Sequence, residues 1–362
     1  MKITEVKASL HRVAVEVPLL KDKIVTPVLF AVVETEQGIM GYGLTRGPSR
    51  FGMKEFINRE LGPFLKGKDP LETERIWALV QKQFNPRWQT GMWSSAVSAI
   101  DIALWDIKGK HYKEPVWRLL GGAQNPVQGY VTFGLKQYSK EQLVEVAKQL
   151  VAQGEKRLKM VVAVDPDDPK VDAARVRAVR DAVGDSVELM IDANYLFSLN
   201  RAVELCKLVE PYGITWFEEP VYQNDAALLV ELRRHTSIPL AAGQNEGHRF
   251  RHRELIANHA IDIAQPNVCS VGGYTEAVKV AALAQAFNLP IANGGGWPHH
   301  NMHLQAAMLN GWRVEFHFEM WGVGDLIYKE PPAPEQGWVK LPETPGLGLE
   351  PRRDALKEFE EK

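Results

Sequence analysis

Hydrophobic and polar residues alternate along the first part of the chain. Two such segments, KITEVKASLHRVAVEV and VLFAVVETEQG, flank a loop from Pro18 to Pro27, and IMGYGLTRG follows them. Period-two alternation predicts half-buried strands. Helical patterns come next, over residues 53–65 and 70–84 and in the amphipathic segment SSAVSAIDIALWDIKGKHY. An antiparallel sheet followed by helices predicts an α+β domain.

After Gly122 the pattern changes to short apolar runs that alternate with helical windows. Windows such as NRAVELCKLVEPY and TEAVKVAALAQAF carry apolar residues at i, i+3, i+4 and i+7. Strands alternating with helices predict an α/β domain with a closed parallel barrel. The predicted strands are GYVTFG, RLKMVVAV, VELMID, ITWFEE, IPLAAG, IDIAQP, LPIANG and WRVEFH.

The predicted domains are residues 1–124, residues 125–322 and a C-terminal segment, residues 323–362. This last segment is rich in proline and glycine, contains the strand-like WVKLP, and is expected to return to the first domain.

Composition excludes several classes of partner. A formal charge of −2, from 43 basic and 45 acidic residues, gives no basic field for nucleic acid. No apolar run is long enough to cross a membrane, and the first residues lack the apolar core of a signal peptide. Cys206 and Cys269 have no zinc-site spacing and are predicted to be buried thiols. A cytoplasmic location is therefore expected.

Three residues with side-chain oxygen donors follow apolar runs at equal spacing, Asp192 in MIDAN, Glu218 in WFEEP and Gln244 in AAGQN. Successive barrel strands end side by side on one rim, so we expect these oxygens to converge. Mg²⁺ prefers oxygen ligands and leaves positions open for a substrate carboxylate. Taken singly, the two acids are equally compatible with a helix N-cap or a surface position. Glu246 is an alternative to the uncharged Gln244.

Longer motifs carry a resemblance to a known family. They are SAIDIALWDIKGK followed by LLGG, the DAN, FEEP and GQN segments, DIAQPNVCSVGGYTEAVKVAALA and PGLGLE. In this combination the chain is similar to the mandelate racemase/muconate lactonizing enzyme family of the enolase superfamily. The resemblance implies an α+β capping domain on a modified (β/α)7β TIM-like barrel. It also implies Mg²⁺ that stabilises the enediolate formed when a base removes the proton α to a carboxylate, and a homo-oligomer, a dimer or an octamer.

The resemblance also locates the usual bases, from which this sequence departs. The Lys-x-Lys expected on the second barrel strand is LKMVV here, which gives Lys159 and then Val161. The Asp/His pair expected on strands six and seven corresponds to Asn267 and to residues 293–295, Asn-Gly-Gly. Lys159 is predicted to neutralise the substrate carboxylate or to act as a desolvated base, and an ion pair with Asp192 is the structural alternative.

Two histidines lie just beyond the seventh strand, in GGGWPHH. His299 and His300 are predicted to replace the missing bases, although loop or helix-cap positions would explain them equally well.

Further residues are expected to bind a small-molecule carboxylate. The resemblance places Glu315, on the eighth strand, against the substrate carboxylate, and a strand-end salt bridge explains it nearly as well. Strand periodicity directs Asn194 to the same side as Asp192. Asn267, together with Arg46 and Lys21 from the first domain, completes this set, and the basic residues favour a sugar acid.

The leading hypothesis is a magnesium-dependent dehydratase that converts a sugar acid to a 2-keto-3-deoxy acid, because one base suffices for that reaction. A racemase needs two bases on opposite faces of the substrate, so racemisation or epimerisation is disfavoured. Cycloisomerisation also needs only one base and stays open. The third alternative is a barrel that binds a carboxylate without turning it over.

Overall fold

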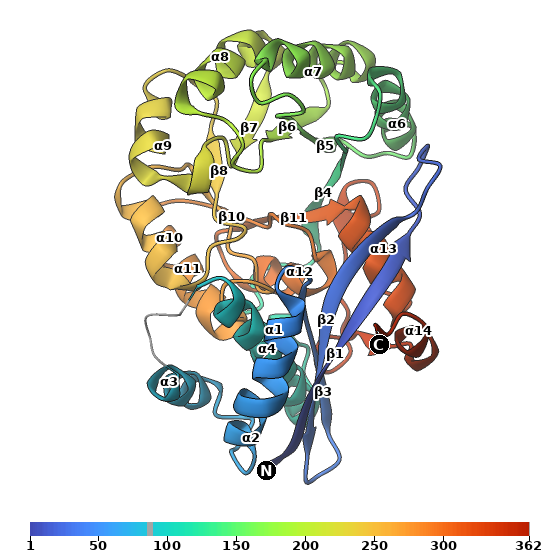
Figure 1. Ribbon diagram of the computed structural model, residues 1–362, viewed down its shortest axis with the longest axis vertical. Coiled ribbons are helices and arrows are strands. Elements are labelled where there is room, and N and C mark those ends of the chain that lie inside the picture. Colours follow the sequence, from blue (N-terminus) through green and yellow to red (C-terminus); the bar gives the residue numbers. More distant parts are fainter. Residues whose placement is uncertain (85–89, 362) are drawn as a thin grey trace.

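The chain forms an antiparallel sheet with helices at one end and a closed parallel barrel at the other (Figure 1). The computed structural model describes residues 1–84 and 90–361. Both predicted architectures, the α+β capping part and the barrel, are confirmed.

The capping part begins with a three-stranded sheet in the order β1-β2-β3, antiparallel throughout. Its long helix, α4 (Met92–Tyr112), lies close against β3 because two glycines leave room for it. A Cβ atom at Gly43 would lie 1.8 Å from the carbonyl oxygen of Ala99, and one at Gly41 would lie 2.0 Å from that of Ala103. The elements are β1 (Ile3–Val15), β2 (Ile24–Thr35), β3 (Met40–Arg46), α1 (Arg50–Phe56), a π-helical turn (Ile57–Leu61), α2 (Gly62–Leu65), α3 (Thr73–Gln83), α4 and α5 (Val116–Leu119).

The barrel contains all eight predicted strands, and parallel pairing of the last strand with the first closes it. A helix stands between each strand and the next, which is the (β/α)7β order. The strands are β4 (Val127–Gly134), β5 (Arg157–Val161), β6 (Glu188–Asp192), β7 (Ile214–Glu218), β8 (Leu240–Ala242), β9 (Ile263–Ala264), β10 (Ile291–Ala292) and β11 (Gly311–His317). The helices are α6 (Lys140–Ala152), α7 (Pro169–Val183), α8 (Leu199–Val209), α9 (Ala226–Arg233), α10 (His248–Ala257), α11 (Tyr274–Ala286) and α12 (Pro298–Ala307).

Local sequence explains where barrel helices begin. Ser139 caps α6 and forms a reciprocal capping box with Gln142. Asp168 caps α7, and Pro169 occupies its first turn, where no backbone donor is needed. The strands are buried on both faces, as expected for a parallel sheet covered by helices. Both cysteines are buried free thiols, as predicted.

The C-terminal segment contacts both parts of the molecule. The predicted boundary after residue 322 falls inside a continuous helix, α13 (Phe318–Ile327), which packs beside β1 and β2 (Figure 1). The last residues bond to the first strand, where the amide of Arg12 donates to the carbonyl of Phe359. WVKLP contributes β13 (Trp338–Val339), which pairs antiparallel with β4 of the barrel. The remaining elements are β12 (Tyr328–Lys329), β14 (Glu350–Pro351) and α14 (Arg353–Glu358).

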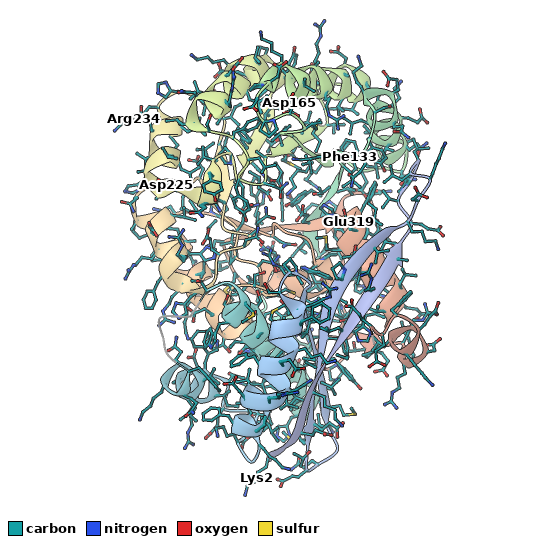
Figure 2. All side chains as sticks on the ribbon, in the orientation of Figure 1. Lys2, Phe133, Asp165, Asp225, Arg234 and Glu319 are labelled. Atoms are coloured by element: carbon teal, nitrogen blue, oxygen red, sulfur yellow. The ribbon has the colours of Figure 1, made fainter. Side chains whose placement is uncertain are left out.

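Charged side chains such as Lys2 and Arg234 project from the outer surface (Figure 2). In the part of the chain that the structure describes, no helix is both long and apolar enough to cross a membrane.

Candidate active site

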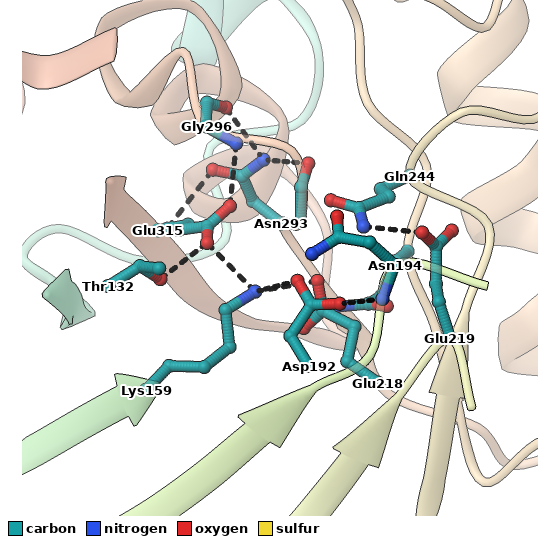
Figure 3. A network of polar contacts seen from close by, with 12 residues as sticks. Thr132, Lys159, Asp192, Asn194, Glu218, Glu219, Gln244, Asn293, Gly296 and Glu315 are labelled. Carbon is teal, nitrogen blue, oxygen red and sulfur yellow. Dashed lines mark hydrogen bonds and ion pairs between the residues drawn. The ribbon is translucent and has the colours of Figure 1, made fainter. Parts of the chain in front are cut away.

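Charged side chains from β5, β6, β7 and β11 come together at one mouth of the barrel (Figure 3). Asp192 on β6 stands directly opposite Glu218 on β7 in the strand register, so the two carboxylates are neighbours. Lys159 reaches them from β5, and Glu315 reaches the same point from β11. The prediction that Asp192 and Glu218 converge is therefore met by the geometry.

Lys159 lies at the centre of this cluster and is completely buried. Its Nζ lies 2.6 Å from Glu218 Oε1, 2.8 Å from Glu315 Oε1 and 3.3 Å from Asp192 Oδ2. Burial alone would lower the pKa of Lys159, but the charges of Glu218 and Glu315 outweigh burial and raise the pKa well above its usual value. The ion pair with Asp192 that was the structural alternative is present, as one of three.

Glu315 is held by donors from other strands and loops. Its Oε1 accepts a hydrogen bond from Thr132 Oγ1 at 2.5 Å, and its Oε2 accepts one from the amide of Gly296 at 2.6 Å. Although burial raises the pKa of Glu315, Lys159 dominates and keeps the pKa below its usual value. Glu315 is therefore an ionised partner of Lys159.

Glu218 has a second set of partners on its other oxygen. Gln265 Nε2 donates to Oε2 at 2.9 Å, and Trp216 Nε1 donates at 3.1 Å. Burial raises the pKa of Glu218 well above its usual value, and the charge of Asp192 adds to this against the opposing Lys159. One ammonium thus faces three carboxylates, those of Asp192, Glu218 and Glu315.

This shortage of positive charge is what a divalent cation would remedy. Asp192 and Glu218 supply two adjacent carboxylates, and Gln244 lies two residues beyond the end of β8, the next strand (Figure 3). Among residues 1–84 and 90–361 no three His, Cys, Asp or Glu side chains form a metal-ligand group.

Gln244 is bound to a carboxylate next to the cluster. Its Nε2 donates to Glu219 Oε2 at 2.6 Å, and Asn224 Nδ2 donates to the other oxygen of Glu219 at 3.1 Å. Burial, together with the charge of Asp192, raises the pKa of Glu219 to about 8. A bound cation would favour the ionised form of this carboxyl. Glu246, the alternative third donor, instead pairs with Arg251.

The two predicted asparagines have different surroundings. The backbone amide of Asn194 donates to Asp192 Oδ1 at 2.9 Å, and its side chain lies next to Gln244 (Figure 3). The side chain of Asn267 bonds to the carbonyl of Gly294, the amide of Cys269 and Asn301 Nδ2. Both polar atoms of the Asn267 side chain are therefore used in hydrogen bonds that hold the backbone beside the site.

The position at which the resemblance predicts a histidine, Gly294, has no space for one. A Cβ atom at Gly294 would lie 2.8 Å from Gln265 Nε2 and 2.9 Å from Glu218 Oε1. A side chain at this position must displace both groups. The packing around residue 294 therefore requires glycine and leaves no room for a base at this position.

His299 and His300 lie on α12 in a different environment. Both are buried, and their rings pack near Tyr328. His300 Nε2 is 3.2 Å from the hydroxyl of Tyr328. Burial lowers the pKa of His299 to about 4 and that of His300 to about 3. In residues 1–84 and 90–361 neither ring shares a hydrogen bond or ion pair with the Lys159 cluster.

The basic residues from the capping part lie at separate places. Arg46 lines a cavity of about 360 Å³ together with Tyr195 and Asn245, which follow the predicted metal ligands Asp192 and Gln244 along the chain. Lys21 lines a different cavity, formed by residues 16–23 of the β1–β2 loop. The structure thus brings Arg46 to the barrel mouth and leaves Lys21 on its own loop.

Several residues of the site were not found from the sequence. Thr132, Gln265 and Trp216 each donate to a carboxylate of the cluster. Strand periodicity gave a usable signal for Trp216, which is two residues before Glu218 and therefore on the same side of β7. Thr132 had no such signal because its partner lies on the last strand.

Comparison with known proteins shows two family models and many relatives. The model described as "Mandelate racemase / muconate lactonizing enzyme, N-terminal domain" matches residues 14–121, and the model described as "Enolase C-terminal domain-like" matches residues 142–355. A D-galactarolactone cycloisomerase from Agrobacterium fabrum is 32% identical over 348 residues, which cover 90% of this chain and 89% of the relative. An arabinonate dehydratase from Saccharolobus solfataricus is 30% identical over 335 residues, with 90% and 89% covered.

Solved structures are similar over the whole chain. The 3,6-anhydro-D-galactonate cycloisomerase from Zobellia galactanivorans superposes with a TM-score of 0.90 at 32% identity and covers 100% of both chains. The L-talarate dehydratase from Polaromonas sp. JS666, complexed with Mg and L-glucarate, has a TM-score of 0.86 at 30% identity and covers 100% of this chain and 98% of that one.

Proposed function

Because the chain belongs to the mandelate racemase/muconate lactonizing enzyme family, we propose that it removes the proton α to the carboxylate of a sugar acid and eliminates the β-hydroxyl. The product would be a 2-keto-3-deoxy acid. The observation that supports this most is the contact of a single lysine, Lys159, with Asp192, Glu218 and Glu315 at the barrel mouth. Relatives named arabinonate, D-galactonate and D-xylonate dehydratase agree with the proposed reaction.

Asp192, Glu218 and Gln244 are the residues that would hold Mg²⁺. When bound, the ion supplies Lewis-acid stabilisation of the charge that develops on the substrate carboxylate. Solved relatives complexed with magnesium support this choice of metal. The excess of carboxylates over ammonium in the cluster supports it independently.

Lys159 is proposed to move the protons. If Asp192 and Glu218 held Mg²⁺, Lys159 Nζ would keep only Glu315 as an ionic partner. The pKa of Lys159 would then fall toward the range where an amine accepts a proton. Nζ takes the α-proton, and the resulting ammonium protonates the departing β-hydroxyl, which leaves as water. The enol that remains loses its hydroxyl proton and gains a proton at C3, which gives the 2-keto-3-deoxy acid. Glu315, fixed by Thr132 and Gly296, orients Nζ throughout.

A panel of aldonic and aldaric acids in D₂O with Mg²⁺, followed by proton NMR, tests this proposal. Loss of the α-proton signal with formation of a 2-keto acid is expected, and Lys159→Met should abolish it. Exchange without elimination would instead identify a racemase or epimerase. No change with any acid would identify a barrel that binds carboxylates without turnover.

Cycloisomerisation is the second candidate, favoured by the relatives named D-galactarolactone and 3,6-anhydrogalactonate cycloisomerase. It needs one proton-transferring group, as dehydration does. Lactones and anhydro-sugar acids in the same panel distinguish cycloisomerisation from dehydration. Cycloisomerisation gives a product of the same mass as the substrate, whereas dehydration releases one water.

We also propose a homo-oligomer, a dimer or an octamer, and a cytoplasmic location. Light scattering of the purified protein tests the first, and cell fractionation tests the second.

A further inference from the structure

A buried carboxylate that the proposed chemistry does not use lies beside the one uncharged donor. Glu219 follows Glu218 at the end of β7 and is completely buried. Its Oε2 accepts the hydrogen bond from Gln244 Nε2 at 2.6 Å (Figure 3). Asp192 and Glu218 each bring a charge to the proposed cation site, whereas Gln244 brings none.

The contact with Glu219 fixes which end of the Gln244 amide faces the cluster. The amide nitrogen of Gln244 is the atom that faces Glu219, because Nε2 is the atom that donates to Oε2. The amide oxygen is directed to the other side, where a Cβ atom on Gly295 would lie 3.0 Å from it. The adjacent Gly294 stands against Glu218 Oε1 in the same way, at 2.9 Å. The two oxygens therefore face the same turn.

Glu219 is itself held in place from several directions. Asn224 Nδ2 donates to its Oε1 at 3.1 Å, and its backbone amide donates to the carbonyl of Ala241 at 2.9 Å. Its φ of 43° lies in the left-handed region that non-glycine residues seldom adopt. Strain of this kind persists where the surroundings determine the conformation, and it is concentrated at functional sites.

From these contacts we infer that Glu219 is a positioning residue for the divalent-cation site. It holds the amide nitrogen of Gln244 and so orients the amide oxygen toward the cation. The inference rests on the proposed function, because it requires that Asp192, Glu218 and Gln244 hold the ion.

Titration calorimetry with Mg²⁺ alone tests this inference through a double-mutant cycle at Glu219 and Gln244. In the natural background, Glu219→Gln is expected to weaken Mg²⁺ binding about tenfold, the lower end of the effect of removing a residue that orients a ligand. With Gln244→Glu in place both terminal atoms of residue 244 are oxygens and no orientation is needed, so adding Glu219→Gln should change the affinity less than twofold. Glu155→Gln, which neutralises a buried carboxyl remote from the site, is the matched control.

Equal effects of Glu219→Gln in both backgrounds, or no effect in either, would overturn the inference and leave the proposed function standing. Failure of the natural protein to bind Mg²⁺ at all would overturn both. Thermal unfolding of each variant, measured without metal, shows whether a loss of affinity reflects a loss of fold.

Discussion

At the scale of single residues, the site depends on a charge balance that Lys159 maintains. One ammonium lies within ion-pair distance of three buried carboxylates, and one of these, Glu218, has its other oxygen satisfied by neutral donors. Removing one partner from a buried ionic cluster leaves uncompensated charge, which costs more than an exposed ion pair contributes.

We therefore expect Lys159→Met to lower the free energy of unfolding by about 3–5 kcal/mol in metal-free buffer. Urea denaturation measures this loss. Mg²⁺ should restore part of it, because a cation can take the place of the ammonium charge. Lys140→Met, at an exposed position on α6, is the control and should unfold like the natural protein. An unchanged midpoint for Lys159→Met would contradict the charge balance described above.

His300 gives a prediction about pH. Burial lowers its pKa to about 3, below the value of about 6.5 expected in the unfolded chain. The unfolded state therefore binds a proton first as the pH falls, and the folded state loses stability between pH 6.5 and 3. Between pH 7 and 5 the natural protein should lose about 2 kcal/mol more than His300→Asn.

Urea denaturation at the two pH values checks this difference. The same variant tests the catalytic role predicted for His300. Full turnover of His300→Asn at pH 7.5 would remove that residue from the mechanism.

At the scale of helices and strands, two glycines set how closely α4 approaches β3. The carbonyls of Ala99 and Ala103 occupy the space where side chains on Gly43 and Gly41 would lie. These neighbours are backbone atoms of a long helix, so they cannot move aside as a flexible side chain would.

Gly43→Ala is accordingly expected to destabilise the protein by about 3 kcal/mol, at the upper end of overpacking effects. Thermal denaturation measures it. Gly38→Ala, where a Cβ meets nothing within 4 Å but φ is 77°, separates backbone strain from collision and should cost about 1 kcal/mol. Equal losses of stability in Gly43→Ala and Gly38→Ala would show that α4 moves away from β3 at little cost.

The elements and the strand-end acids could be predicted from the sequence because both follow local rules. Apolar periodicity located the eight barrel strands, and equal spacing placed Asp192 beside Glu218. The partners of Glu315 could not be found in this way, since Thr132 lies on the first barrel strand and Gly296 in a loop after the seventh. His299 and His300 were predicted as bases because they lie close along the chain to the seventh barrel strand, but α12 directs both rings toward Tyr328.

At the scale of the whole molecule, the proposed cation would couple to folding. An ion that binds only the folded state adds stability that grows with its concentration, by about 2.7 kcal/mol at one hundred times its dissociation constant. Chelation with EDTA should lower the melting temperature, and Mg²⁺ should raise it. Asp192→Asn should abolish the response, and a response of equal size in this variant would show that the ion binds elsewhere.

Closure of the barrel by β4 and β11 has a consequence for synthesis on the ribosome. Glu315 arrives on the last barrel strand, and its partner Thr132 arrives on the first, so the centre is assembled from opposite ends of the barrel sequence. A nascent chain that has emerged only as far as β10 would hold Lys159, Asp192 and Glu218 without the strand that completes the ring. Catalytic competence would then appear abruptly, late in translation, when β11 joins its neighbours.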